Sequence, residues 1–261
     1  MITAGFDIGT KYVKICIVKD GEITGYDIRQ LVGSFSKVMK SSYKAALDKA
    51  GIFGFQVRNK TACGFGANLV KNADFIVDVE SSIAHTAYRL NPETRTVIDA
   101  GALFLNICSL SKDGMILDRA ENEKCAAGSG KLLDMITSAL EVPIDEISNV
   151  CSESVKPYKM SNSCAVFAES EVISRVNLGD NTSDILAGII ISIVEKSKTM
   201  YSRINAHGPV SVTGGLAHIP FFTLKLKEIL NCELIPLKIN PSLAGAFGAA
   251  LIGAEKLNRK K

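Results

Sequence analysis

Two stretches of the chain share one alternation of apolar and polar residues. Residues 7–23 read DIGTKYVKICIVKDGEI, and residues 99–116 read DAGALFLNICSLSKDGMI. Each begins with Asp-x-Gly, continues through a β-rich run, and reaches a Lys-Asp-Gly turn. An Asp-Gly turn between β-rich runs is a strong hairpin signal. The repeat predicts two copies of a strand–turn–strand–turn–strand unit, and a chance match of common turns is the alternative.

After each predicted hairpin set, the apolar period lengthens toward that of a helix. Alternating strands and helices favour an α/β fold, and the duplication implies two similar βββαβα lobes around a cleft. Helix start and stop signals place the helices. We expect helices at 34–50, 80–90, 127–140, 165–176, 183–204, 219–230 and 242–257, a short helix near 67–72, and strands at 56–63, 74–79, 209–213 and 233–236.

Composition limits the class of protein further. The chain has 261 residues, of which 47% are hydrophobic, and carries 30 basic against 27 acidic side chains. This is enough apolar material for a sizeable core, and a net charge of +3 is too small to indicate nucleic acid or an anionic membrane as partner. The N-terminus lacks a signal-peptide pattern, and no apolar run is long enough to span a bilayer. We expect a soluble cytoplasmic protein with reduced thiols.

The two Asp-x-Gly turns are the first candidates for chemistry. A glycine at such a turn lets backbone N–H groups approach a phosphate, and Thr10 and Lys11 beside Gly9 add a hydroxyl and a cation. Pseudo-symmetry would place Asp7 and Asp99 at one cleft, where paired carboxylates can hold Mg²⁺ through water. Taken singly, either aspartate is as well explained as an ordinary turn residue.

A third candidate follows the predicted strand at 209–213. The strand runs into Gly214, Gly215 and Leu216 and then a helix, which is a common arrangement for binding a nucleotide. Gly-Gly is also an ordinary turn, so the signal is weak alone. Its position after two Asp-x-Gly hairpins makes it the expected adenosine loop.

In order and spacing, these elements resemble the actin, Hsp70 and sugar-kinase superfamily, which has a ribonuclease H-like fold. The resemblance implies an ATP/ADP and Mg²⁺ site with phosphate loops at 7–14 and 99–106 and the adenosine loop at 213–217. It adds Lys14 and Gly101 to the nucleotide contacts. It also implies that the last helix returns to the first lobe, which gives lobes of residues 1–94 plus 246–261 and residues 95–245.

Seven cysteines are present, and two of them differ from the rest. Cys125 and Cys164 each precede a predicted helix, whose dipole favours a thiolate, and the small residues Gly128, Ser129 and Gly130 leave space beside the first. An iron–sulfur cluster needs four thiolates, so a symmetric dimer would have to supply two more. A small buried residue is the competing interpretation. We apply it to the remaining cysteines, Cys16, Cys63, Cys108, Cys151 and Cys232.

Four segments resemble the ATP-dependent activators of 2-hydroxyacyl-CoA dehydratases and the related benzoyl-CoA reductase ATPase subunits. They are KCAAGSGKLLDM, SNSCAVFAESEVIS, VTGGLA and GAFGAALIGAE. The resemblance implies a homodimer with one bridging [4Fe–4S] cluster, bound by Cys125 and Cys164 of each subunit. It further implies ATP-driven electron transfer from a ferredoxin or flavodoxin to a partner iron–sulfur dehydratase or reductase.

The chain departs from this family at the second phosphate loop. The family usually has Asp-Ile-Gly-Gly-Gln-Asp-Ser-Lys there, whereas this chain has Asp-Ala-Gly-Ala-Leu-Phe-Leu-Asn at 99–106. Apolar Ala102, Leu103 and Phe104 cannot place Mg²⁺ or an attacking water. Two alternatives therefore stay open: a weakly hydrolysing, cluster-binding regulatory subunit, and a small-molecule kinase with Asp99 as base.

Overall fold

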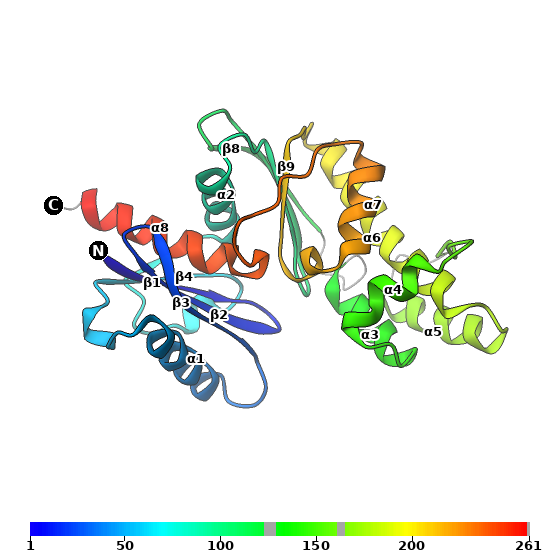
Figure 1. Cartoon of the computed structure of the whole chain (residues 1–261), viewed down its shortest axis with the longest axis horizontal. Helices are drawn as coiled ribbons and strands as arrows, with labels where there is room; N and C mark the ends of the chain where they lie inside the picture. The colour runs from blue at the N-terminus through cyan, green and yellow to red at the C-terminus, as the bar shows by residue number, and fades with distance from the viewer. Residues whose placement is uncertain (123–128, 161–164, 260–261) are drawn as a thin grey trace. The chain divides into compact units, whose positions relative to one another are not determined.

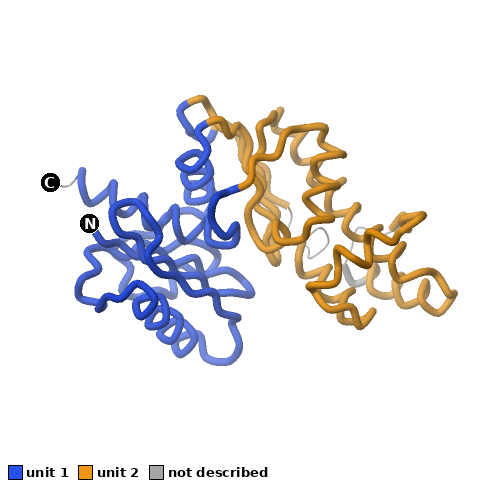
Figure 2. The backbone as a smooth tube through the Cα atoms, viewed as in Figure 1, with its two compact units in different colours: residues 1–92, 113–116, 237–261 blue, residues 93–112, 117–236 orange. Residues whose placement is uncertain are grey.

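The computed structural model describes residues 1–122, 129–160 and 165–259. Contacts between residues divide the chain into two compact units (Figure 2). Each unit is built on one β-sheet with helices packed against it. Unit 1 comprises Met1–Pro92, Asp113–Ile116 and Leu237–Lys261, and unit 2 comprises Glu93–Lys112 and Leu117–Pro236.

The sheet of unit 1 has five strands in the order β3-β2-β1-β4-β5. The first three form the antiparallel meander that the first repeat predicts, and β4 and β5 extend it in parallel on the other side of β1. Asp20 and Gly21 both have positive φ, as the tight β2–β3 turn requires. The strands are β1 (Ile2–Ile8), β2 (Tyr12–Lys19), β3 (Glu22–Gln30), β4 (Asn59–Cys63) and β5 (Phe75–Ile76).

Helices cover both faces of this sheet (Figure 1). Alternate residues of β1 point to opposite faces, so Ala4, Phe6 and Ile8 pack with helix α1 (Phe35–Ala50). On the other face, a Cβ at Gly5 would lie 1.8 Å from the carbonyl oxygen of Ala246 in α8 (Ala244–Arg259). The helix therefore approaches the sheet more closely than any side chain at this position would allow.

Helix α8 also packs closely on α2 (Val79–Leu90) and on β4, and small residues make both contacts possible. A Cβ at Gly248 would lie 1.8 Å from the carbonyl oxygen of Ser82, and one at Gly253 would lie 2.1 Å from Thr61 Oγ1. The glycines of the segment GAFGAALIGAE thus have a packing role. Short 3₁₀ turns complete the unit: η1 (Gly54–Gln56), η2 (Ala67–Leu69), where the sequence predicted a short helix at 67–72, and η5 (Pro241–Leu243).

The sheet of unit 2 repeats the first four strands in the order β8-β7-β6-β9. The predicted strand at 233–236 is reduced to one parallel bridge between Leu234 and Val210, in which Val210 N–H donates to the carbonyl oxygen of Glu233 and Ile235 N–H donates to that of Val210, each at 2.8 Å. That prediction was wrong in extent. The strands are β6 (Thr96–Ala100), β7 (Leu105–Leu110), β8 (Ile116–Glu121) and β9 (Val210–Thr213).

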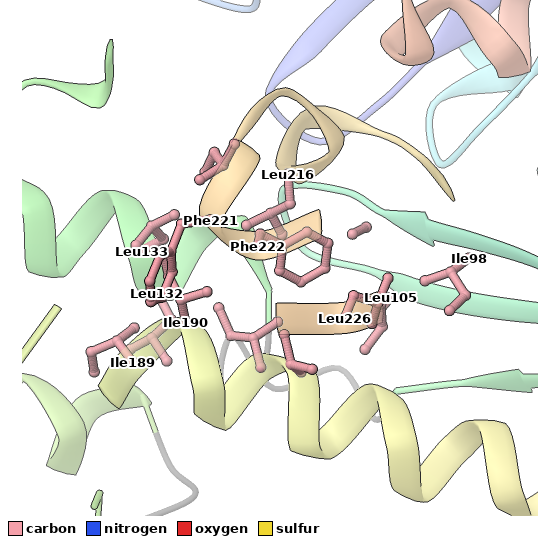
Figure 3. Packing of buried hydrophobic residues seen from close by; sticks show 14 of the residues in the cluster. Ile98, Leu105, Leu132, Leu133, Ile189, Ile190, Leu216, Phe221, Phe222 and Leu226 are labelled. Carbon is pink, nitrogen blue, oxygen red and sulfur yellow. The ribbon is translucent and has the colours of Figure 1, made fainter. Parts of the chain in front are cut away.

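The core of unit 2 lies between this sheet and its helices (Figure 3). Ile98 and Leu105 from the sheet, Ile190 from α6 and Phe222 from α7 are all fully buried in it. The sequence did not predict α4, a short helix between two loops. The elements are α3 (Gly130–Ala139), η3 (Ile144–Glu146), α4 (Ile147–Ser152), α5 (Ala165–Asn177), α6 (Thr182–Arg203), η4 (Gly215–His218) and α7 (Pro220–Leu230).

The matching strand orders confirm the predicted α/β fold with a duplicated sheet. In the part of the chain that the structure describes, no helix combines the length and apolar character needed to cross a membrane.

Candidate functional site

The first Asp-x-Gly turn joins β1 to β2 in unit 1. Asp7 and Lys14 are cross-strand neighbours, and Lys14 Nζ donates to Asp7 Oδ2 at 2.8 Å. The side chains are 8% and 20% exposed, so the pair is largely screened from solvent. The turn closes through Gly9 N–H, which donates to the carbonyl oxygen of Tyr12 at 3.0 Å. Of the other predicted phosphate contacts, Thr10 is exposed and the Lys11 ammonium lies 5.4 Å from the centroid of the Tyr12 ring.

Two glycines surround the Asp7 carboxylate. A Cβ at Gly64 would lie 2.6 Å from Asp7 Oδ1, and a Cβ at Gly245 would lie 2.8 Å from Asp7 Oδ2. Gly245 opens α8, and Gly64 follows β4 with φ +85°. Main chain thus packs directly against the carboxylate on two sides, and only glycine fits at either position, which holds the Asp7 side chain in place near the end of β1.

The second Asp-x-Gly turn, in unit 2, has the same main-chain geometry. Gly101 N–H donates to the carbonyl oxygen of Phe104 at 2.9 Å, as Gly9 does in the first turn. Asp99 differs in its partner, because Thr213 Oγ1 donates to Asp99 Oδ1 at 2.7 Å. The structure thereby joins the second predicted phosphate loop to the predicted adenosine loop within one unit.

The predicted adenosine loop has a counterpart that sequence reasoning missed. Gly214 follows β9 with φ +86°, and a Cβ there would lie 2.4 Å from the carbonyl oxygen of Ala100. Gly64 follows β4 with φ +85°, and a Cβ there would lie 2.7 Å from the carbonyl oxygen of Ile8. Ile8 and Ala100 directly follow the two aspartates, so the glycine turns are equivalent. The only signal was the short run Gly64-Phe65-Gly66.

In the rest of the predicted adenosine loop, one residue is buried and another borders open space. Leu216 is buried and holds the short turn η4 against the unit 2 core. A Cβ added at Gly215 would meet nothing within 4 Å, so this face of the loop is open. An open, backbone-rich face beside Asp99 and Thr213 is suited to a ligand that packs flat against main chain.

The residues at the start of α3 contact the second turn. Ser129 is buried, and Gly130 N–H donates to the carbonyl oxygen of Gly101 at 3.0 Å. The Gly130 N–H group therefore already has an acceptor and is not free for a phosphate. Gly128, Cys125 and Cys164, which the sequence singled out, lie outside the described residues.

The described cysteines are placed as packing residues. Cys16, Cys63, Cys108 and Cys151 are buried, and Cys232 is half-buried. Burial raises the pKa of the Cys151 thiol to about 12, and burial together with the Asp7 charge raises the pKa of Cys16. Thiols with raised pKa values are protonated at neutral pH and are poor metal ligands.

Comparison with known proteins extends over the whole chain. Residues 4–253 match the BadF/BadG/BcrA/BcrD ATPase family. The 2-hydroxyisocaproyl-CoA dehydratase activator of Clostridioides difficile is 32% identical over 96% of this chain and 94% of its own length. The (R)-2-hydroxyglutaryl-CoA dehydratase activating ATPase of Acidaminococcus fermentans is also 32% identical, over 97% of this chain and 97% of its own length.

Solved structures give the same result. The Clostridium difficile activator of 2-hydroxyisocaproyl-CoA dehydratase with bound ADPNP matches with a TM-score of 0.93 at 30% identity, covering 100% of this chain and 97% of that one. A ROK family glucokinase from Streptomyces griseus matches at 0.61 and 12% identity, over 98% of this chain and 100% of that one, which shows the shared fold alone. The chain therefore belongs to the BadF/BadG/BcrA/BcrD ATPase family, with dehydratase activators among its relatives.

Proposed function

We propose that this protein is an ATP-dependent electron activator that acts as a homodimer with a bridging [4Fe–4S] cluster. The full-length match, at a TM-score of 0.93, to an activator structure with bound ADPNP is the main support for this proposal. The reduced donor, a ferredoxin or flavodoxin, loses one electron, and an iron–sulfur dehydratase or reductase gains it. Hydrolysis of ATP to ADP and phosphate supplies the free energy.

The nucleotide role rests on the two Asp-x-Gly turns. In both turns the first glycine closes the turn through its N–H, and a glycine at such a turn lets main-chain N–H groups approach a phosphate. In this proposal, Asp7 and Asp99 hold Mg²⁺ through water, and the loops at 7–14 and 99–106 contact the phosphates. Gly214, Gly215 and Leu216 then form the nucleoside side of the site.

The cluster role rests on the donor chemistry of the chain. Four of the five described cysteines are buried, and the pKa is raised for Cys16, Cys151 and Cys232. Cys125 and Cys164 are the two thiols left, and each precedes a helix, α3 or α5. Two chains would supply the four thiolates that a [4Fe–4S] cluster takes. Such a cluster would carry one electron at a time between donor and acceptor.

One observation favours a second candidate, a subunit of the same family that binds nucleotide but hydrolyses it slowly. The second turn presents Ala102, Leu103 and Phe104, none of which has a polar side chain, and all three are partly exposed. General-base or metal assistance to water needs a positioned polar group. Asp99 is the one carboxylate in the loop, so we expect turnover to be slow while binding is retained.

Anaerobic purification tests the cluster assignment directly. We expect a brown dimer with about two iron and two sulfide per chain, since four of each are shared by two subunits. Cys125→Ser and Cys164→Ser should each abolish the cluster, and Cys16→Ser, which alters a buried packing residue, should keep it. A colourless monomer, or a Cys164→Ser variant with full iron content, would refute the assignment.

ATP turnover by the same preparation separates the two candidates. The activator predicts steady hydrolysis that depends on Mg²⁺, and the regulatory subunit predicts ADPNP binding with negligible hydrolysis. Restoring polar groups by the double change Leu103→Gln and Phe104→Asp should raise turnover if the apolar turn limits it. Phosphoryl transfer to a sugar would instead indicate a kinase.

A further inference from the structure

The second phosphate turn and the start of α3 are joined by backbone hydrogen bonds. Gly130 N–H donates to the carbonyl oxygen of Gly101 at 3.0 Å, and Lys131 N–H donates to that of Ala102 at 2.6 Å. These two groups are among the N–H groups that lack a partner within their own helix. The turn thus caps α3, and Ser129, the N-cap residue, makes no capping bond through its side chain.

Asn122 holds the other half of the same turn. Its Oδ1 accepts from Leu105 N–H at 2.7 Å, its Nδ2 donates to the carbonyl oxygen of Leu103 at 3.2 Å, and its own N–H donates to the carbonyl oxygen of Leu105 at 3.0 Å. Asn122 is only 4% exposed. A buried amide that satisfies main-chain groups on both sides of a turn fixes the turn's shape.

The turn enters all five of these hydrogen bonds through main-chain atoms only. The bonds are therefore unaffected by which side chains stand at Ala102, Leu103 and Phe104. A chain can lose the polar groups suited to hydrolysis here and still keep the connection to α3.

We propose that Asn122 is a positioning residue that makes the second phosphate turn and the first turn of α3 respond as one unit. Nucleotide bound at residues 99–106 then changes the environment of the α3 N-terminus, because the turn is too rigid to adjust to the nucleotide without moving α3. This inference rests on the proposed function in one respect, because it requires nucleotide at that turn. It requires neither an assembled cluster nor rapid hydrolysis.

Hydrogen exchange on the cluster-free protein tests the proposal, with ADPNP and Mg²⁺ as the probe. In the wild type we expect nucleotide to slow amide exchange both at 101–106 and at 130–134, by about tenfold. In Asn122→Ala, slowing at 101–106 should persist, and slowing at 130–134 should fall to about twofold or less. Both proteins are compared at saturating ADPNP, with the dissociation constant measured for each, and this separates lost connection from lost binding.

Two further variants keep the result decisive. Asn122→Asp retains the acceptor for Leu105 N–H but loses the donor to the carbonyl oxygen of Leu103. It should therefore lose part of the slowing at 130–134. It replaces the alanine variant in the test if Asn122→Ala does not fold. Asn149→Ala removes an exposed asparagine whose side chain donates to Glu146 Oε2 at 2.9 Å, away from the second phosphate turn, and it should behave as the wild type.

If ADPNP slows amide exchange at 130–134 in both Asn122 variants as much as in the wild type, the inference is overturned. Slowing at 101–106 alone in the wild type would also overturn it, although the proposed function would then stand. If ADPNP slows exchange at neither segment, nucleotide does not act at this turn, and the proposed function falls together with the inference.

Discussion

Asp7 and Lys14 form an ion pair that is mostly withdrawn from solvent, with Lys14 Nζ 2.8 Å from Asp7 Oδ2. The lysine at this place in the first repeat becomes Asn106 in the second, where Asp99 instead accepts from Thr213. Two copies of one turn have therefore diverged in how they satisfy the same carboxylate. The difference is at the level of single residues, because the main-chain geometry of the turns is shared.

Lys14→Met should destabilise unit 1, because it leaves the Asp7 carboxylate in a largely buried position without its partner. Removing one member of a fully buried pair costs about 3–5 kcal/mol, and the 20% exposure of Lys14 reduces this to about 1–3 kcal/mol. Urea unfolding measures the change. Lys37→Met, on the exposed side of α1, should be neutral, and equal losses in both variants would contradict the assignment.

A second residue-level prediction concerns acid stability. Hydrogen bonds from Ser154 Oγ and from the N–H groups of Lys156 and Val155 lower the pKa of Asp184. A carboxylate with a lowered folded-state pKa stabilises the protein above its unfolded pKa, and the stabilisation is lost as pH falls through the folded value. Asp184→Asn should therefore lower the thermal midpoint at pH 7, and the gap to wild type should begin to narrow below about pH 4 and close only below the folded-state pKa.

Asp145→Asn is the matched control for this test. Asp145 is exposed in the 3₁₀ turn η3, which directly precedes α4, and its replacement should leave the thermal midpoint unchanged at every pH. A gap between Asp184→Asn and wild type that keeps its pH 7 size down to the lowest pH at which both proteins are folded would show that the stabilisation does not depend on the charge.

At the scale of elements, close packing of α8 organises unit 1. Gly5, Gly245, Gly248 and Gly253 all lie where a Cβ would collide with neighbouring atoms. Gly5 lies in β1 and the other three lie in α8, but sequence alone shows small residues and not what they contact. The contacts come from β1, β4 and α2, which are distant in the chain.

Gly248→Ala should destabilise the protein by about 3 kcal/mol, because the added methyl group overlaps the carbonyl oxygen of Ser82 and forces α2 away. Gly215→Ala should leave stability unchanged, since its Cβ would face open space. Chemical denaturation of both variants measures the contrast. Similar stability of the two would mean that α2 and α8 are not packed as described.

The hairpins, α1 and most other helices could be predicted from sequence because their signals are local. Asp-Gly turns fix β2–β3, and Gly51 with φ +65° ends α1 where the pattern predicts. The strand at 233–236 was overestimated because strand length depends on the register of its neighbour. α4 was missed because six residues between two loops carry too little periodicity.

The candidate site was predictable in part for the same reason. Asp7, Asp99 and Gly101 were candidates because the Asp-x-Gly turn recurs, and Gly214 was one because a Gly-Gly turn follows a predicted strand after the two hairpins. Asn122 was not found, because its importance lies in bonds to residues 17 and 19 positions earlier. A lone asparagine at the end of a strand carries no signal until the turn that it holds is known.

At the scale of the whole molecule, nucleotide should stabilise the folded chain. ADPNP with Mg²⁺ at about 100 times its dissociation constant is expected to add about 2.7 kcal/mol. Asp99→Asn should weaken this stabilisation at fixed ADPNP, and the shift of the thermal midpoint measures it. An unchanged midpoint in the wild type at millimolar ADPNP would argue against a nucleotide site.

If nucleotide controls electron transfer in this protein, ATP should alter the iron–sulfur centre. Electron paramagnetic resonance of the anaerobic, dithionite-reduced dimer, recorded with and without saturating ATP, measures this. We predict an iron–sulfur signal that changes in shape or redox midpoint when ATP is added and that is absent in Cys164→Ser. A signal identical in both samples, with ATP shown to be bound, would contradict the coupling.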